Sequence, residues 1–241
     1  MITPEQLNQI KLEAIEAYPY EAIWFLTKMG GLYQVENIHP EPEEHFSASG
    51  MDSLQAQKEG LLAVIHSHCD KPEVPSKLDM ELQERLAIPC GIISTNGKMA
   101  TNINWLGDQS QPLIGRTFAH GTADCYSIVR DYYFQKKGVV LQDVPREWQW
   151  WDSGEENYLA DLFASRGFYE IPMSQAKEGD VALIRVRGPV IHHCGVVVGN
   201  DLLLHHPGAD EPVDKSKLSI EEPIYRYLPY VEKFVRFKEL C

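Results

Sequence analysis

The sequence has 241 residues, of which 44% are hydrophobic, and a formal net charge of −13. This length is that of one or two domains, and the hydrophobic content indicates globular domains rather than a disordered chain. A chain with this excess of acidic residues lacks the basic surface that nucleic-acid binding requires, so we expect no nucleic-acid partner.

We expect a soluble chain made in a cytoplasm. Its longest apolar runs fall short of the roughly 20 residues of a membrane span, and Met1–Glu5 is unlike the start of a signal peptide. Five cysteines, at positions 69, 90, 125, 194 and 241, are widely spread. Their odd number argues against a disulfide framework and leaves room for one reactive thiol.

In the first half of the chain, helical and strand patterns alternate. The expected elements are a capped helix from Thr3 that stops before Pro19, a strand or short buried element at 22–26, a helix at 51–59, a strand that ends at His68, and a helix at 77–87. In the last of these, Leu78, Leu82 and Leu86 follow one another at intervals of four residues, which predicts its apolar face. Asn96-Gly97 predicts a hairpin between strands at 90–95 and 98–103.

The pattern dissolves between Trp105 and Pro112, which predicts a linker and two domains, 1–106 and 112–241. In the second domain, apolar residues at helical spacing follow Gly121–Asp124, so Cys125 is expected in the first turn of a buried helix. Strands at 181–186, 191–199 and 202–206, the last two joined by a turn at Asn200-Asp201, predict an antiparallel sheet.

One candidate metal site stands where the strand ending at His68 meets the helix at 77–87. His66 and His68 are two residues apart in a strand, so their side chains point the same way. Together with Asp79 they make a set of two imidazoles and one carboxylate, which is typical of a catalytic zinc site with water as the fourth ligand. Ser76 and Asp79 also fit a helix N-cap with its N3 acid, and paired histidines can lie idle at a strand end.

The spacing of His66, His68, Ser76 and Asp79 resembles the motif of the JAMM (MPN+) metalloprotease family, and Glu21 matches its upstream glutamate. The resemblance implies zinc held by both histidines and Asp79, with Glu21 as general base and Ser76 stabilising the tetrahedral intermediate. Trp24 and Cys69 stand where the family usually has a glycine and a proline. Neither position is that of a ligand.

A second candidate site centres on Cys125. The partial positive charge of a helix N-terminus favours the thiolate, which is the nucleophilic form of cysteine. The antiparallel sheet could present a histidine to it, as thiol catalysis requires. The residues alone leave two other interpretations open for the histidines at 192, 193, 205 and 206: partnered strand-end residues or a second metal site.

The segments Asp124–Ser127, Glu178–Leu183, His193–Asn200 and Leu203–His205 together resemble the NlpC/P60 family of papain-like cysteine peptidases. The resemblance implies Cys125 as nucleophile, His193 as base and His205 as the residue that orients His193. It leaves His192 and His206 out of register and Cys194 in core packing. Leu113 stands where many members of the family carry a tyrosine.

The two resemblances imply an α+β fold in two domains: a JAMM-like mixed sheet flanked by helices, then a papain-like domain with an antiparallel sheet and a helix that carries the cysteine. Their combination resembles the tail-tip assembly protein family of lambda-type long-tailed phages. That resemblance implies a bifunctional hydrolase, in which the thiol domain cuts peptidoglycan stem peptides and the zinc domain cleaves a peptide or isopeptide bond.

The same resemblance implies partners and places of action. The partners would be other phage tail-tip proteins and bacterial peptidoglycan, and the chain would act in the host cytoplasm during assembly, at the virion tail tip, and in the host periplasm on infection. Two alternatives stay open: a structural tail-tip component with one or both sites inactive, and a cellular enzyme similar to a deubiquitinase. The wall-peptidase motifs argue against the second.

Overall fold

The computed structural model describes residues 2–154 and 157–238. The chain divides into two compact units, Met1–Asp108 and Gln109–Cys241. In the described ranges, no helix combines the length and the apolar character needed to cross a bilayer.

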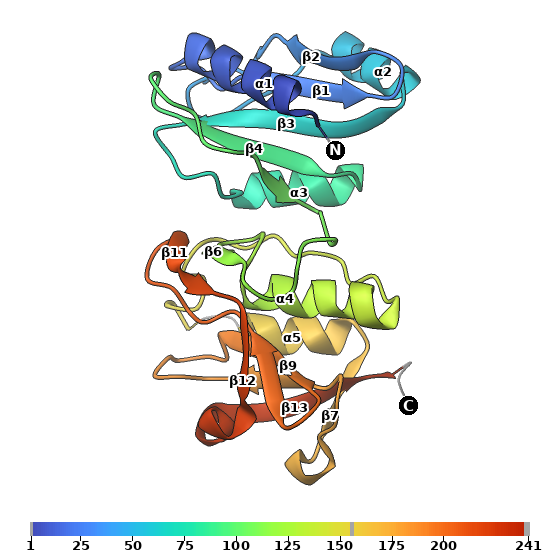
Figure 1. The fold of residues 1–241 in the computed structure, drawn as a ribbon, viewed down its shortest axis with the longest axis vertical. Coiled ribbons are helices and arrows are strands. Elements are labelled where there is room, and N and C mark those ends of the chain that lie inside the picture. Colours follow the sequence, from blue (N-terminus) through green and yellow to red (C-terminus); the bar gives the residue numbers. More distant parts are fainter. Residues whose placement is uncertain (1, 155–156, 239–241) are drawn as a thin grey trace. The chain divides into compact units, whose positions relative to one another are not determined.

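A mixed five-stranded sheet forms the centre of the first unit (Figure 1). Its strand order is β2-β1-β3-β4-β5, in which β3 and β4 are parallel and the other neighbours are antiparallel. The elements in chain order are α1 (Pro4–Ala17), β1 (Ile23–Thr27), β2 (Gly31–Val35), α2 (Gly50–Lys58), β3 (Leu61–Cys69), α3 (Lys77–Leu86), β4 (Cys90–Thr95) and β5 (Asn104–Leu106).

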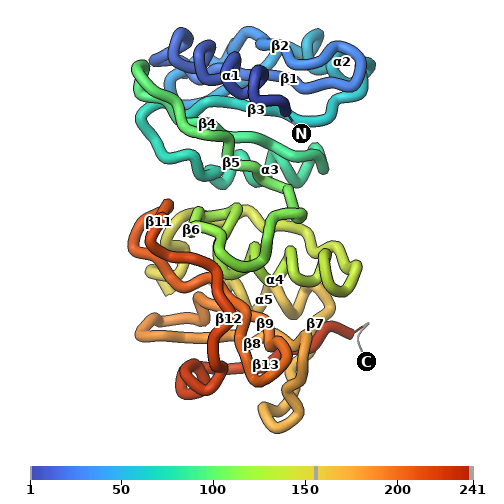
Figure 2. Tube along the Cα trace, viewed as in Figure 1, coloured from blue at the N-terminus to red at the C-terminus, as the bar shows by residue number. Residues whose placement is uncertain are grey.

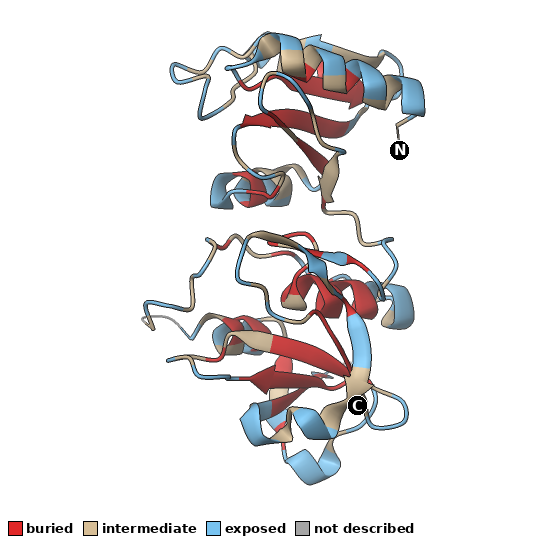
Figure 3. Ribbon diagram, turned by 60° about the vertical axis from the view of Figure 1, so that its left-hand side comes forward, coloured by how far each residue is buried: buried red, intermediate tan, exposed pale blue. Residues whose placement is uncertain are grey.

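Helices cover both faces of this sheet, because the strand side chains alternate between two apolar layers. Ile10 and Ala14 of α1 pack with Trp24 and Ile65 on one face. The other face packs against α2 and α3 through a second cluster: Ile23, Phe25, Val64, Ala56, Met80, Cys90 and Leu106. Figure 3 shows the buried strands between these layers.

The predicted helices and strands of this unit are confirmed, with two corrections. Leu78 is 60% exposed and does not belong to the buried face of α3, whose buried residues are Asp79 and Met80. The first turn is oriented by the Asp79 carboxylate, which contacts two histidines of β3, and this rotates Leu78 outward.

The predicted strand at 98–103 is wrong. The Asn96 side chain accepts hydrogen bonds from the backbone N–H groups of Lys98 and Met99. The Thr101 hydroxyl oxygen accepts a hydrogen bond from the Ser94 N–H. These side-chain bonds interrupt the ladder after one bridge, and β4 pairs with β5 instead. Trp105 therefore lies in a strand, so the predicted linker begins too early.

The second unit contains a six-stranded antiparallel sheet of order β12-β10-β9-β8-β13-β7. Its helices and the strands of its large sheet are α4 (Cys125–Tyr132), α5 (Tyr158–Ser165), β7 (Phe168–Ile171), β8 (Val181–Ile184), β9 (His193–Val198), β10 (Leu202–His205), β12 (Ile220–Pro223) and β13 (Val231–Phe237). A π-helical turn, Tyr133–Lys137, continues α4, and three short 3-10 turns are Met173–Gln175, Ile224–Arg226 and Leu228–Tyr230.

Two further strands, β6 (Thr117–Ala119) and β11 (Val213–Leu218), lie far apart in the sequence and pair side by side (Figure 2). The main core of the unit lies between the large sheet and α4 and α5, where Ile128, Val129 and Phe163 are buried against strand residues such as Val196. The predicted α+β class and antiparallel sheet are confirmed.

A tight hairpin joins β9 and β10. Its loop is Gly199–Asp201, in which Asn200 and Asp201 have φ of 64° and 55°, in the left-handed region that asparagine and aspartate tolerate better than most residues. The register pairs Val198 with Leu202 and Gly195 with His205. The turn therefore fixes which residues of the two strands lie opposite each other.

Candidate functional site

Three predicted ligand side chains of the first unit converge. His66 and His68 project from β3 toward Asp79 in the first turn of α3. The Nε2 atoms of the two histidines are 3.1 Å apart, and they lie 3.2 and 3.4 Å from the two carboxylate oxygens of Asp79. All three residues are buried, and one ligand atom from each lies within 4.8 Å of the others.

Ser76 and Asp79 form the helix cap that the alternative interpretation predicted. The Ser76 hydroxyl donates to Asp79 Oδ2 at 2.7 Å, the Ser76 N–H donates to the same oxygen at 2.8 Å, and the Asp79 N–H donates to Ser76 Oγ at 3.2 Å. These bonds leave Asp79 Oδ1 to His66. Capping thus orients the carboxylate toward the histidines, so the two interpretations are compatible.

The donor atoms suit a divalent cation. His68 Nδ1 lies 3.1 Å from the Pro72 carbonyl oxygen, so Nδ1 carries the proton and Nε2 offers its lone pair to the cluster. The ring of Phe46 stacks on that of His66 with centroids 4.2 Å apart. Two imidazole nitrogens and a carboxylate that lie close together are the types of ligand that catalytic zinc sites use.

Charge in this cluster is strongly redistributed. Burial opposes ionisation of Asp79, but the adjacent imidazoles hold its pKa well below the ordinary value. Burial lowers the pKa of His66. Burial also acts downward on His68, but hydrogen bonding and charge from Asp79, with the charge of Glu21, raise the pKa of His68. A carboxylate held ionised beside imidazoles is the state that binds a cation.

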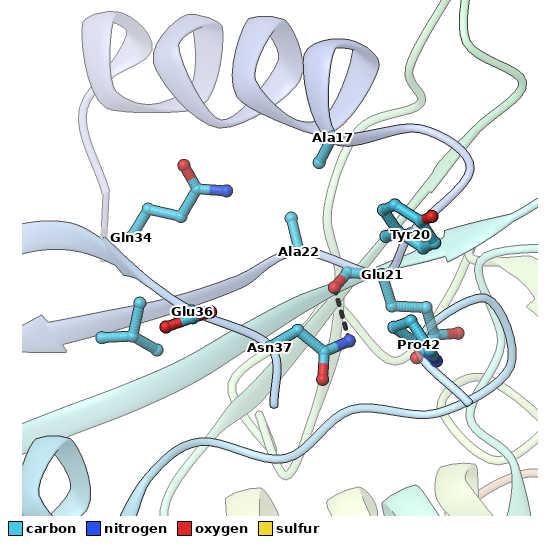
Figure 4. A pocket seen from close by; sticks show the side chains of 9 residues that line it. Ala17, Tyr20, Glu21, Ala22, Gln34, Glu36, Asn37 and Pro42 are labelled. Atoms are coloured by element: carbon cyan, nitrogen blue, oxygen red, sulfur yellow. Dashed lines mark hydrogen bonds between the residues drawn. The ribbon is translucent and has the colours of Figure 1, made fainter. Parts of the chain in front are cut away.

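Glu21 lies just before β1 and is buried. Ile23 pairs with His66, and continuing this antiparallel register by two residues sets Glu21 opposite His68 on the same face. The Asn37 side chain donates to the Glu21 carbonyl oxygen at 2.8 Å (Figure 4), beside a pocket of about 480 Å³. Burial, with repulsion from Asp79, raises the pKa of the Glu21 carboxyl to about 7, so it can exchange a proton near neutrality.

The two residues that depart from the JAMM pattern have structural partners. Trp24 is fully buried on the α1 face of the sheet, and its Nε1–H donates to Glu13 Oε2 at 2.6 Å. It thereby ties α1 to β1 on the face opposite the histidines. Cys69 ends β3, and burial raises the pKa of its thiol to about 11, so it stays protonated.

In the second unit, Cys125 is the first residue of α4, as predicted. Asp124 is the N-cap: its Oδ1 accepts from the Ser127 N–H and hydroxyl at 2.9 Å, and its Oδ2 accepts from the Gly121 N–H at 2.9 Å. Cys125 is half-buried and lines a pocket of about 370 Å³ together with His193 and His205. The tryptophans at 148, 150 and 151 also line this pocket.

The pKa of the Cys125 thiol is held well below its ordinary value. Hydrogen bonding from the Cys194 thiol is the largest cause, followed by hydrogen bonding and charge from His193; burial and Asp124 act in the opposite direction. Cys194 itself is buried in the main core, and burial with the nearby Cys125 raises its own pKa. Only Cys125 of this pair is therefore suited to be a nucleophile.

His193 and His205 meet as a hydrogen-bonded pair, with His193 Nε2 3.0 Å from His205 Nδ1. Burial and the charge of His193 lower the pKa of His205 to about 4, so His205 is neutral near pH 7. Its Nε2 lies 2.9 Å from Glu222 Oε1 on β12. The sequence reasoning found both histidines and missed Glu222.

The remaining predicted positions fall outside this line of contacts. His206 is fully buried, with Nε2 3.0 Å from the Arg116 carbonyl oxygen. His192 lines the pocket, its Nδ1 is 3.0 Å from the Val190 carbonyl oxygen, and its own carbonyl is 4.0 Å from Cys125 Sγ. Leu113 packs against the main core.

A buried chain of alternating positive and negative side chains begins at Asp124. Arg146 Nη2 donates to Asp124 Oδ2 at 2.6 Å and its Nη1 donates to Asp143 at 2.9 Å; the chain continues through Arg130 to Asp131, and Arg116 closes it at 2.6 Å from Asp131. The six members are Asp124, Arg146, Asp143, Arg130, Asp131 and Arg116, all at most 9% exposed. Three arginines and three aspartates cancel in charge, so the nucleophile's helix cap is fixed without burying a net charge.

Comparison with known proteins identifies the second unit. The model of the NlpC/P60 family matches residues 105–231. The chain belongs to the NlpC/P60 family. This membership implies a cysteine peptidase hydrolase, and the meeting of His193 with His205 beside Cys125 is in accord with it.

Two curated relatives carry the same description. The chain is 35% identical to "Tail tip assembly protein K" of Escherichia phage lambda over 158 residues, which cover 64% of this chain and 74% of that one. It is 29% identical to "Tail tip assembly protein K" of Escherichia phage N15 over 205 residues, or 83% of each chain. The second alignment is longer than either structural unit.

The residues that sequence reasoning missed are charged. Arg116, Arg130 and Arg146 are spread over thirty positions and carry no local motif, and an isolated arginine is ordinarily exposed. One signal was present: Arg130 and Asp131 fall among the apolar residues of a helix that is buried on several sides. A charge pair within such a segment indicates a buried ion pair.

We predict that Arg130→Met destabilises the second unit by roughly 3–5 kcal/mol, because Asp131 and Asp143 would each lose a buried partner. Urea denaturation read by hydrogen-exchange mass spectrometry reports the peptides of residues 109–241 separately from the rest. The matched control is Arg185→Met, which breaks the exposed pair with Glu232 and should cost less than about 1 kcal/mol. Equal losses in the two variants would contradict a special role for the buried chain.

We predict that Cys125 reacts with iodoacetamide at about pH 6.5 more than about tenfold faster than Cys69 or Cys90, because each unit of pKa difference is a factor of ten in thiolate. The pKa of Cys125 is lowered, so its thiolate persists as pH falls, whereas burial raises the pKa of Cys69 to about 11 and that of Cys90 to about 12. Peptide mapping identifies the labelled residue. Preferential labelling of Cys194 would remove Cys125 from the role of nucleophile.

Proposed function

We propose that this chain is a phage tail-tip assembly protein whose second unit hydrolyses peptidoglycan stem peptides during infection. The two relatives named tail tip assembly protein K support the first part. The observation that carries the second is Cys125 at the start of α4 beside the hydrogen-bonded pair His193–His205. Other tail proteins are then its partners, the virion tail is its place, and the host periplasm is where the peptidase acts.

The thiol site supplies the groups that peptide hydrolysis needs. The Cys125 thiolate attacks the peptide carbonyl carbon, and His193, having taken the thiol proton, returns it to the leaving amine. His193 then takes a proton from water, which hydrolyses the thioester and frees the thiol. The aromatic wall of the pocket, formed in part by Trp148 and Trp151, would hold the substrate beside Cys125.

We also propose that the first unit binds zinc through His66, His68 and Asp79 and cleaves a peptide or isopeptide bond of a partner during assembly. The buried donor set of two imidazole nitrogens and a carboxylate supports this. Bound zinc would supply Lewis acidity and lower the pKa of a coordinated water. Glu21, buried opposite His68, would accept the water proton as general base.

In this proposal Ser76 orients Asp79 and also stabilises the tetrahedral intermediate. Its hydroxyl donates to Asp79 Oδ2, which orients that carboxylate toward the histidines. To stabilise a tetrahedral intermediate, the hydroxyl would have to rotate away from Asp79. The backbone bond between Ser76 N–H and the same oxygen would keep Asp79 in place.

The alternative is a structural tail-tip component in which one or both sites are inactive. It leaves unexplained why the first unit collects ligand atoms at one buried point and why the second lowers the pKa of its accessible thiol. Metal content and thiol reactivity separate the alternatives one unit at a time.

We predict that the purified full chain reduces the turbidity of peptidoglycan in the presence of a strong chelator. Cys125→Ala should lower the rate of this reaction by at least about a hundredfold, because it removes the nucleophile. Mass spectrometry of the released fragments identifies the bond. Asp79→Ala is the matched control, since it alters only the first unit and should retain wall activity. Loss of wall activity on chelation would show that the two sites are not independent.

We predict close to one zinc per chain in the wild type, near none in Asp79→Ala, and unchanged content in Glu21→Ala, because Glu21 is not among the three ligands. Metal analysis after gel filtration measures this, with circular dichroism to show that each variant is folded. Glu84→Ala, an exposed change on the same helix, is the control. Full zinc in a folded Asp79→Ala protein would refute the ligand assignment.

A further inference from the structure

A carboxylate lies behind the histidine pair of the thiol site, and the mechanism above does not use it. Glu222 Oε1 is 2.9 Å from His205 Nε2, on the far side of His205 from His193. We propose that Glu222 is a positioning residue, which fixes the proton positions on His205 and His193 so that His193 presents its Nδ1 to the Cys125 thiol. This inference rests on the thiol chemistry proposed above.

The fold holds Glu222 in this place. β12 pairs with β10 so that Ile220 lies opposite His205 and Glu222 lies opposite Leu203, which puts Glu222 diagonal to His205 on the same face of the sheet. Tyr227 donates to Glu222 Oε1 at 2.5 Å, and Arg226 Nη1 donates to Oε2 at 2.6 Å. Both carboxylate oxygens are thus engaged, one of them by an arginine.

These donors keep Glu222 ionised. Burial acts upward on its pKa, but hydrogen bonds from Tyr227, His205 and Arg226 outweigh burial and lower the pKa to about 2. An ionised carboxylate can only accept hydrogen bonds. His205 Nε2 must therefore carry a proton, and this N–H donates a hydrogen bond to Glu222.

The proton on His205 Nε2 determines the rest of the line. His205 is neutral near pH 7, so its Nδ1 is unprotonated and can only accept. His193 Nε2, 3.0 Å away, must then donate to it. The one ring nitrogen of His193 left for the thiol is Nδ1, which is a base when His193 is neutral and a proton donor to the leaving amine when it is charged.

Close packing keeps His205 in this line. Gly195 lies opposite His205 in the β9–β10 register, and a Cβ on Gly195 would come within 2.9 Å of the His205 Cβ. The ring of Tyr227 lies edge-on to that of His205, with centroids 4.8 Å apart. His205 is 1% exposed, so water does not compete for its ring nitrogens.

The charge of Glu222 also favours the reactive form of the site. When Cys125 passes its proton to His193, the positive charge is stabilised through neutral His205 by the carboxylate beyond it. Three other groups act on these residues: His206 lowers the pKa of His205, Asp124 raises that of Cys125, and the Cys194 thiol lowers that of Cys125. None of these three is altered by a change at Glu222.

The test is the pH dependence of Cys125 alkylation by iodoacetamide in the full chain, followed by peptide mapping. Glu222→Gln keeps the shape of the side chain and removes its charge. We expect the midpoint of the alkylation profile to move about one unit toward higher pH, which is an about tenfold slower reaction below the midpoint. Glu222→Asp keeps the charge and should return most of the shift.

Glu221→Gln is the matched control, because it removes the same charge from the neighbouring, exposed residue of β12. It should leave the profile unchanged. Tyr227→Phe keeps Glu222 but removes one of its hydrogen bonds, so it should move the midpoint in the same direction by less, and it serves if Glu222→Gln does not fold.

The outcomes separate this inference from the proposed function. If Cys125 of the wild type is no more reactive than the buried cysteines, the thiol peptidase proposal fails. If the wild type is reactive and a folded Glu222→Gln variant, or Tyr227→Phe in its place, gives a superimposable profile, the role of Glu222 is refuted. A shift as large in Glu221→Gln would also refute it, because it would be a general charge effect.

Discussion

The second unit depends on one buried carboxylate. Asp124 caps α4 through Ser127, closes the preceding turn through the Gly121 N–H, and pairs with Arg146. A buried carboxylate without a partner would become protonated or would remain exposed to solvent, because the free-energy cost of removing a charge from water is large. The alternating arginines and aspartates behind it offset that cost. As a result, both oxygens of Asp124, the residue that sets the start of α4 and with it the position of Cys125, are held by hydrogen bonds.

The first unit also positions a carboxylate at a helix N-terminus, but with different contacts. Its helix cap and its candidate ligand are the same side chain, since Asp79 accepts from Ser76 with one oxygen and faces His66 with the other. Ser76 thereby limits the rotation of the carboxylate. In both units a helix N-terminus places a reactive or ligating side chain against a strand that carries histidines: β3 in one and β9 in the other.

Local chemistry made part of this structure predictable. The spacing of His66 and His68 places them on one face, the apolar residues after Cys125 form one helix, and Asn200-Asp201 closes a hairpin; each follows from a few consecutive residues. Glu222 and the arginines could not be found in this way, because their partners lie on other segments: His205 is 17 positions from Glu222, and Asp131 is 15 positions from Arg116. Arg146, for example, donates to Asp124 across 22 positions of the sequence.

The two errors in the first unit have the same origin. The stripe of Leu78, Leu82 and Leu86 is regular, but the contact of Asp79 with the histidines decides how the helix is rotated. The hairpin at Asn96-Gly97 begins as predicted and ends early, because side chains there satisfy the backbone groups that a ladder would have used. In both cases a polar contact outweighed the periodic pattern.

The three-residue loop Gly199–Asp201 has a consequence for how this protein can vary. Surface turns usually accept insertions, since they contribute few buried contacts. Here the turn sets the register in which β10 returns along β9, and side chains alternate along each strand. One residue gained or lost, with the ladder re-formed around it, would send His205 to the opposite face, away from His193. The length of this exposed loop therefore decides on which face His205 lies, although none of its own three residues takes part in the chemistry.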